Sequence, residues 1–123
     1  MARILGPKCR HCRRAGKKLY LKGSRCYTAK CAIEKDPSPP GKKGRKTRIT
    51  DYGIHLREVE IARKSYGVSM TQLKRYYFTA LKMPGDTGIT LSKMLASRLD
   101  NVIYTAGFAL SRAHARQMIV HGH

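Results

Sequence analysis

The chain has 123 residues, of which 26 are Lys or Arg and seven are Asp or Glu, so its formal net charge is +19. So large a positive charge repels itself in a compact protein and indicates a polyanionic partner whose phosphates neutralise it. No apolar run approaches the ~18 residues of a membrane-spanning helix, and residues 1–7 have no signal-peptide h-region, which favours an intracellular protein.

The positive charge is unevenly distributed along the chain. Residues 1–50 carry 16 basic and two acidic residues, a net charge of +14, whereas residues 51–123 carry ten and five, a net charge of +5. We therefore expect the first part to lie against phosphate and the second to form a basic domain with a core. That core should be mainly aliphatic, because the sequence has two Phe and no Trp.

Residues 1–35 contain four cysteines in two close pairs. Two residues separate Cys9 from Cys12, four separate Cys26 from Cys31, and thirteen separate the pairs. Two thiolate pairs joined by a loop are typical of tetrahedral Zn²⁺. We therefore predict a structural zinc knuckle, with an iron–sulfur cluster, disulfides or unligated thiols as the alternatives. Four thiolates would complete the coordination shell, so the metal would stabilise the fold instead of catalysing a reaction.

Cations dominate the loop between the cysteines. Eight basic residues and no acidic residue lie between Cys9 and Cys31. These are more cations than a cluster of thiolates needs as counter-charge, so most of them should face outward. His11 lies inside the first cysteine pair, and we predict an exposed position for it, facing RNA.

Residues 36–50 lack core-forming side chains. Residues 36–48 include three Pro, two Gly and five basic residues, which predicts an extended segment without regular structure. Such a segment is either a disordered linker or a basic arm that becomes ordered along RNA. The charge density favours the arm.

Residues 51–123 show helical patterns separated by capping residues. We predict a helix over 51–66, a second after the capping box of Ser69 and Gln72, a third over about 88–104 and a short fourth after Ser111. No segment is a convincing strand. The sequence therefore predicts a mainly α fold, made of a zinc knuckle (1–35), a basic extended arm (36–50) and a compact helical domain (51–123).

Taken together, these residues resemble small-subunit ribosomal protein four, the S-four family, in its zinc-binding bacterial form. The resemblance runs almost from end to end and rests on Met1-Ala2-Arg3, Gly6-Pro7, Cys9 to Arg14, Lys18 to Gly23, Arg25-Cys26-Tyr27, Lys30-Cys31-Ala32, Pro39-Pro40-Gly41, Asp51-Tyr52, Leu56-Arg57-Glu58, Tyr66-Gly67, Ser97 to Tyr104, Gly107-Phe108-Ala109, Ser111-Arg112, Ala115-Arg116-Gln117 and His121-Gly122-His123.

The resemblance implies a structural constituent of the small ribosomal subunit that binds ribosomal RNA directly and early in assembly. It also implies neighbouring small-subunit proteins as partners, a position near the messenger RNA entry and an influence on decoding accuracy. No enzyme activity, small-molecule substrate or membrane is implied. The implied location is the cytoplasm, with an organelle ribosome as the alternative.

In the family, residues corresponding to 88–123 open an RNA-binding module that continues beyond the position of His123. The resemblance therefore implies that this module is only partly present. The chain is shortened, or the sequence is incomplete, or another polypeptide supplies the remainder. We expect poor packing beyond about residue 88 in the isolated chain. The missing part of the module would otherwise cover some of its apolar side chains: Leu99, Val102, Met118 and Ile119.

We expect Lys and Arg side chains to supply most of the affinity for RNA, because neutralised phosphates release counterions. The candidate contacts are Arg3, Lys8, Arg10, Arg13, Arg14, Lys17, Lys18 and Lys22 in the knuckle, Lys42, Lys43, Arg45, Lys46 and Arg48 in the arm, and Arg112 and Arg116 on the last helix. Arg98 either contacts RNA or pairs with Asp100. The tyrosines at 20, 27, 76 and 77 either stack on bases or belong to the core.

Two other functions fit the sequence less well. An RNA-modifying enzyme would need a catalytic domain for which the chain has no room, and its five His show no pairing with a nucleophile or base. A DNA-binding regulator would need a recognition helix with polar residues aimed at base edges, whereas the charge here is spread over a knuckle and an arm.

Overall fold

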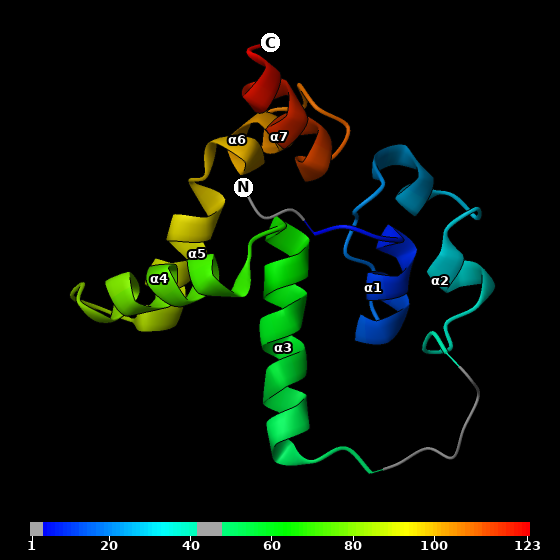
Figure 1. Ribbon diagram of the computed structural model, residues 1–123, viewed down its shortest axis with the longest axis horizontal. Helices are drawn as coiled ribbons and strands as arrows, with labels where there is room; N and C mark the ends of the chain where they lie inside the picture. Colours follow the sequence, from blue (N-terminus) through cyan, green and yellow to red (C-terminus); the bar gives the residue numbers. More distant parts are fainter. Residues whose placement is uncertain (1–3, 42–47) are drawn as a thin grey trace. The chain divides into compact units, whose positions relative to one another are not determined.

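A computed structural model describes residues 4–41 and 48–123 of the chain. All regular structure in these residues is helical, which confirms the mainly α fold (Figure 1). The chain divides into two compact units, one containing Leu5–Ser65 and the other Tyr66–His123.

The first unit begins with the cysteine segment, where the sequence patterns had predicted no helix. This segment forms the helices α1 (Lys8–Ala15) and α2 (Ala32–Lys35) and the 3-10 helix η1 (Gly23–Tyr27). In Figure 1, α1 and α2 lie side by side. Gly16 ends α1 with φ 72°, a left-handed conformation that glycine adopts without strain.

The helix α3 (Asp51–Tyr66) confirms the predicted bounds 51–66. Its N-terminus is capped by Thr50, whose hydroxyl accepts a hydrogen bond of 3.2 Å from the backbone N–H of Gly53. No side chain of α3 is buried, and Tyr52 is 75% exposed, consistent with apolar residues scattered around the helix. No helix in the described residues has both the length and the apolar character of a membrane span.

The second unit has its core between α4 (Met70–Leu81) and α5 (Thr87–Ala96), which lie side by side in Figure 1. Val68, Leu73 and Leu95 form this core, and partly buried side chains pack around it. The predicted cap is confirmed, because the Ser69 hydroxyl accepts a 3.2 Å hydrogen bond from the Gln72 backbone N–H. Tyr77 and Leu81 of α4 are exposed.

The predicted third helix over 88–104 is wrong as one continuous element. The structure divides it into α5 and α6 (Leu99–Thr105), with extended backbone at Arg98 (ψ 137°). The break is stabilised by Asn101, whose side-chain N–H donates a 2.8 Å hydrogen bond to the carbonyl of Ala96. Hydrophobic periodicity continues through such a break, so the pattern alone did not locate it.

The helix α7 (Arg112–His121) packs against α6. As predicted, the helix begins after Ser111, whose hydroxyl caps it by accepting a 3.2 Å hydrogen bond from the His114 backbone N–H. Gly122 ends it with φ 75°. Large apolar side chains on α6, on α7 and in the intervening loop remain 48% to 75% exposed: Leu99, Val102, Phe108, Leu110 and Val120. Poor packing of this region in the isolated chain concerns solution behaviour and stays a prediction.

Candidate nucleic-acid interface

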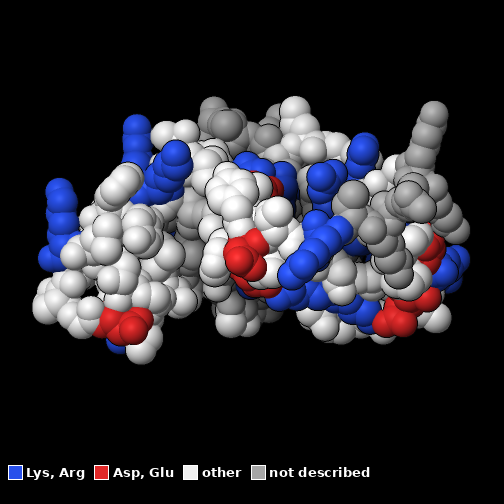
Figure 2. All heavy atoms as spheres, turned by 90° about the horizontal axis from the view of Figure 1, so that it is seen from below, with Lys and Arg blue, Asp and Glu red and all other residues white. Residues whose placement is uncertain are grey.

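Cations on α1 and in the loop after it lie on the surface of the first unit. Arg10, Arg14 and Lys22 are exposed and form no ion pair with a carboxylate of the described residues. Figure 2 shows Lys and Arg side chains extending from the surface at many points, whereas Asp and Glu occupy a few small patches. Unpaired, solvated cations of this kind are available to bind phosphate.

Three other knuckle residues that were predicted to contact RNA form ion pairs with acidic residues of the same unit. Arg13 pairs with Asp36 at 2.8 Å and Lys18 with Glu34 at 2.5 Å, while Lys17 lies 3.5 Å from Glu58. These surface pairs each contribute little to stability, because solvent screens them and the side chains lose entropy. Phosphate can therefore compete for these cations at small cost.

An open groove of about 790 Å³ separates α1 from α3. Its charged lining comes from both helices, with Arg10 and Arg14 on α1 and Arg57 on α3. The ion pair of Lys64 and Glu60, 3.9 Å apart, also lines it on α3. Apolar side chains, among them Leu19 and Leu56, form the rest of the lining. Cations surrounding an apolar floor offer phosphate contacts and a surface for a base in the same place.

His11 lies in this groove, and its predicted exposed position is wrong. Its ring is partly buried, and Nε2 is buried without a hydrogen-bond partner among the described residues. Burial lowers the pKa of His11, and the nearby charges of Lys64 and Lys8 lower it further. The imidazole is therefore neutral at pH 7 and adds no charge to the groove.

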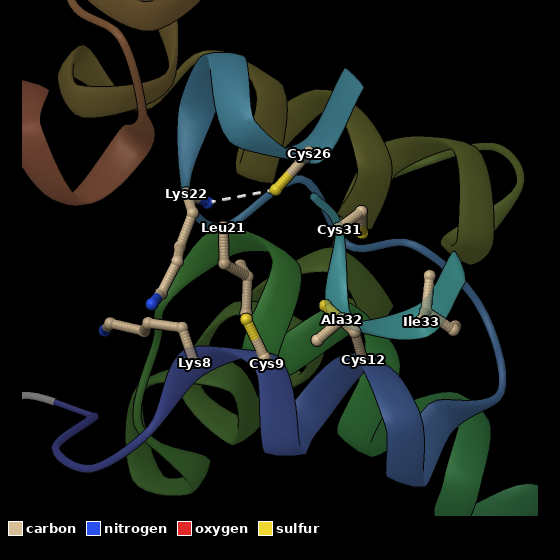
Figure 3. A pocket seen from close by; sticks show the side chains of 9 residues that line it. All are labelled: Lys8, Cys9, Cys12, Leu21, Lys22, Cys26, Cys31, Ala32 and Ile33. Atoms are coloured by element: carbon tan, nitrogen blue, oxygen red, sulfur yellow. Dashed lines mark hydrogen bonds between the residues drawn. The ribbon is translucent and has the colours of Figure 1, made fainter. Parts of the chain in front are cut away.

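The four cysteines line one small cavity of about 10 Å³, between α1, η1 and the start of α2. They do not form a metal site, because no three His, Cys, Asp or Glu side chains in the described part of the chain are arranged to hold a metal ion. Figure 3 shows the sulfur atoms spread around the cavity instead of meeting at one point. The predicted zinc site and its iron–sulfur alternative are therefore wrong.

The geometry gives the physical reason, because four ligands of one ion must converge on it and no such group is arranged in the described residues. Burial raises the pKa of the Cys12 thiol. The sulfur of Cys26 accepts a 3.3 Å hydrogen bond from the Lys22 backbone N–H (Figure 3). None of the four is disulfide-bonded. Cys12, Cys26 and Cys31 are each 7% exposed and act as small apolar residues in the core of this segment.

The predicted arm contacts lie mostly outside the described residues. Arg48 is described and exposed. Five of the candidate cations fall in residues 1–3 and 42–47: Arg3, Lys42, Lys43, Arg45 and Lys46.

Arg112 and Arg116 are held by partners within the second unit. The guanidinium of Arg112 donates a 2.7 Å hydrogen bond to Asn101 Oδ1 and lies 5.0 Å and 4.7 Å from the ring centres of Tyr66 and Tyr104. Every guanidinium nitrogen of Arg116 donates a hydrogen bond, two of them to Asp100 and one to the carbonyl of Gly67. Both side chains therefore connect the helices that surround them.

Arg98 belongs to the same network. Of its two predicted roles, RNA contact or pairing with Asp100, the structure supports the ion pair. Its Nη2 lies 2.7 Å from Asp100 Oδ2, and its Nη1 donates a 2.8 Å hydrogen bond to the hydroxyl of Tyr76. Tyr76 is therefore engaged within the unit instead of presenting a free ring to a base.

Several exposed cations outside the knuckle were not among the predicted contacts. Those without an ion pair in the described residues are Arg57, Lys74, Arg75, Lys82 and Lys93. At 100° per residue, Arg75 lies on the side of α4 away from the buried Leu73 and Ala80, so the helical periodicity of 70–81 already indicated its exposure.

Comparison with known proteins places the whole chain in one group. Residues 3–96 match the family model described as ribosomal protein S4/S9 N-terminal domain, and residues 97–123 match the S4 domain model. The chain is 53% identical to the small ribosomal subunit protein uS4 of Halothermothrix orenii, 54% identical to that of Natranaerobius thermophilus and 51% identical to that of Thermus thermophilus. Each match covers 100% of this chain and 60% of the relative.

Proposed function

The chain belongs to the family of the ribosomal protein S4/S9 N-terminal domain, and from that premise we propose that it is a structural constituent of the small subunit of a bacterial, cytoplasmic ribosome. There it binds small-subunit ribosomal RNA directly and early in assembly. Its other partners are neighbouring small-subunit proteins. Proximity to messenger RNA and an influence on decoding accuracy are part of the same proposal and rest on the family resemblance alone.

The observation that best supports RNA binding is the cationic groove between α1 and α3. Arg10 and Arg14 on one wall and Arg57 on the other are exposed and free of carboxylate partners in the described residues. An RNA backbone entering the groove would meet cations on both sides. Each neutralised phosphate would release counterions, which is the main source of affinity for a polyanion.

The other predicted contacts in the knuckle and arm extend this contact in the proposal. We retain as RNA contacts the predicted residues Arg3, Lys8, Arg13, Lys17, Lys18, Lys22, Lys42, Lys43, Arg45, Lys46 and Arg48. RNA hides its base edges in a deep, narrow major groove, so recognition would depend on shape, backbone and unpaired bases.

Arg112 and Arg116 have a different role in this proposal. Their nitrogens already donate to Asn101, Asp100 and Gly67, so a phosphate would have to displace internal partners. Removing a hydrogen-bonded partner from a buried charge is costly. We therefore propose that they fix the arrangement of α6 and α7, while the RNA contacts of the chain lie on the cations of the groove, the knuckle and the arm.

Removal of the groove cations tests the proposal. We expect the variant with Arg10→Gln, Arg14→Gln and Arg57→Gln to bind a structured fragment of small-subunit ribosomal RNA more weakly than the unmodified chain. Each lost phosphate contact reduces the magnitude of the slope of log K against log[salt] by about 0.7 to 0.9, so the loss of three should reduce it by about 2 to 3. Filter binding at a series of salt concentrations measures it.

The matched control is Lys35→Gln, which removes an exposed cation that does not line the groove. It should leave the slope nearly unchanged. An unchanged slope in the triple variant, or equal losses in both proteins, would contradict the groove as the main contact. Tighter binding to duplex DNA than to structured RNA at one salt concentration would instead favour a DNA-binding regulator.

A further inference from the structure

Two tyrosines of the first unit form an exposed aromatic pair. Tyr20 lies in the loop between α1 and η1, and Tyr27 is the last residue of η1. Their ring centres are 5.0 Å apart with an angle of 31° between the ring planes. Tyr20 is 38% exposed and Tyr27 is 69% exposed. A pair that served only as core would be buried, whereas this one leaves ring surface open to solvent.

The backbone at Tyr20 is strained. Its φ is 52°, the only positive φ of a non-glycine residue in residues 4–41 and 48–123. A bulky side chain in the left-handed region is a genuine outlier, and such strain concentrates at functional positions. Its neighbour Leu19 is only 5% exposed. The left-handed turn thus buries Leu19 while leaving the Tyr20 ring beside Tyr27 at the surface.

The residues that follow each tyrosine supply positive charge. Lys22, Arg25 and Lys30 are exposed and form no ion pair within the described chain. The Arg25 Nε donates a 3.3 Å hydrogen bond to the backbone carbonyl of Lys30, which ties this part of the loop together. The sequence has no acidic residue between Cys9 and Cys31, so nothing in this segment offsets these charges.

We propose that Tyr20 and Tyr27 form a stacking platform for an unpaired base of RNA, with Lys22 and Arg25 binding the phosphates that flank it. Aromatic faces surrounded by cations fit a single-stranded nucleotide, because the base offers a ring to stack and the backbone offers the charge. An apolar protein partner would have to desolvate these cations without a counter-charge. The platform rests on the proposed RNA-binding function and adds base contact to it.

The test compares two fluorescently labelled oligonucleotides of about 12 units, an oligoadenylate and an abasic ribose-phosphate chain of equal charge. We expect the complete chain to prefer the oligoadenylate, because stacking acts on bases alone. Loss of an aromatic side chain typically costs about 1–3 kcal/mol per stacked base, or about 5- to 150-fold in affinity. Tyr27→Ala should therefore bind the oligoadenylate at least about 5-fold more weakly and the abasic chain equally well. Fluorescence anisotropy at fixed salt measures both affinities.

Two further variants keep the test specific. Tyr27→Phe retains the ring and should bind like the unmodified chain. Tyr52→Ala removes a tyrosine of α3 that is 75% exposed and has no ring partner among the described residues, so it should bind both probes normally. Circular dichroism shows whether each variant keeps its helical content.

Each contrary result has a distinct meaning. Equal binding of both probes by the unmodified chain overturns the platform and leaves phosphate binding intact. An equal loss in Tyr27→Ala and Tyr52→Ala also overturns the platform. Failure of the chain to bind either probe or a structured ribosomal RNA overturns the proposed function together with the platform.

Discussion

Asp100 is the most enclosed carboxylate described in the second unit. Its side chain is 6% exposed and accepts hydrogen bonds from both Arg98 and Arg116. Burial alone would raise the pKa of Asp100, but the hydrogen bonds and charges of the two arginines outweigh it and hold the pKa below its usual value of 3.8. Asp100 is therefore ionised at neutral pH and joins α6 to α7.

Replacing Asp100 tests this network. Asp100→Asn leaves two arginine side chains without their counter-charge, and breaking a buried ion pair costs about 3–5 kcal/mol. We expect the free energy of unfolding of the Tyr66–His123 unit to fall by about 3 kcal/mol, measured by urea unfolding. Glu58 forms a surface pair with Lys17, and its side chain is 62% exposed. Glu58→Gln should therefore change the free energy of unfolding by less than about 0.5 kcal/mol. Similar effects of the two substitutions would contradict the network.

Acid titration gives a second readout of the same residue. Because the pKa of Asp100 is lower in the folded than in the unfolded chain, its stabilising effect is fully present above about 3.8. The effect is lost as the pH falls from there through the folded pKa. The difference in unfolding free energy between the unmodified chain and Asp100→Asn should therefore shrink below pH 3.8 and stay constant from pH 5 to 7.

The environments of individual side chains also explain why some of the site predictions failed. The spacing of Cys9, Cys12, Cys26 and Cys31 correctly indicated that the four lie together, since they line one cavity. Spacing does not report whether the sulfur atoms converge on one point, which depends on the backbone and on the rotamers of the four side chains. Likewise, positive charge alone did not distinguish Arg116, which has internal partners, from Arg14, which has none in the described residues.

Helices that carry their own local signals were predictable from sequence. The bounds of α3 match, and the hydroxyls of Ser69 and Ser111 cap α4 and α7 as expected. The cysteine segment has weaker signals, because α1 and α2 are short and no side chain caps either of them. Their stability depends on packing against each other, which a sequence pattern does not contain.

Asn101 controls the break between α5 and α6. It is 7% exposed, donates to the Ala96 carbonyl at 2.8 Å and accepts from Arg112 Nε at 2.7 Å. Asn101→Ala leaves both partners unsatisfied, so we expect the unit to lose about 1–3 kcal/mol of stability. Amide hydrogen exchange should then become faster at residues 96–101 than in α4. Unchanged exchange at these residues would show that the break does not depend on Asn101.

At the scale of the whole molecule, charge exceeds what the fold itself requires. Each unit has a small core, and the chain carries a net charge of +19. Repulsion among so many cations opposes compaction, and a bound polyanion relieves it. Composition alone gives the net charge, because this charge does not depend on how the chain folds, and the polyanionic partner stays a prediction. Only the structure shows which of these cations are exposed and form no ion pair within the described residues.

We propose that direct contact with ribosomal RNA holds the chain in the small ribosomal subunit. The most direct measurement is sedimentation of the tagged chain with small subunits from bacterial cells, before and after a high-salt wash. We expect the unmodified chain to remain with the small subunit through the wash and the Arg10, Arg14 and Arg57 triple variant to be released. A chain that sediments free of the small subunit at low salt, or a triple variant retained as firmly as the unmodified chain, would contradict the account.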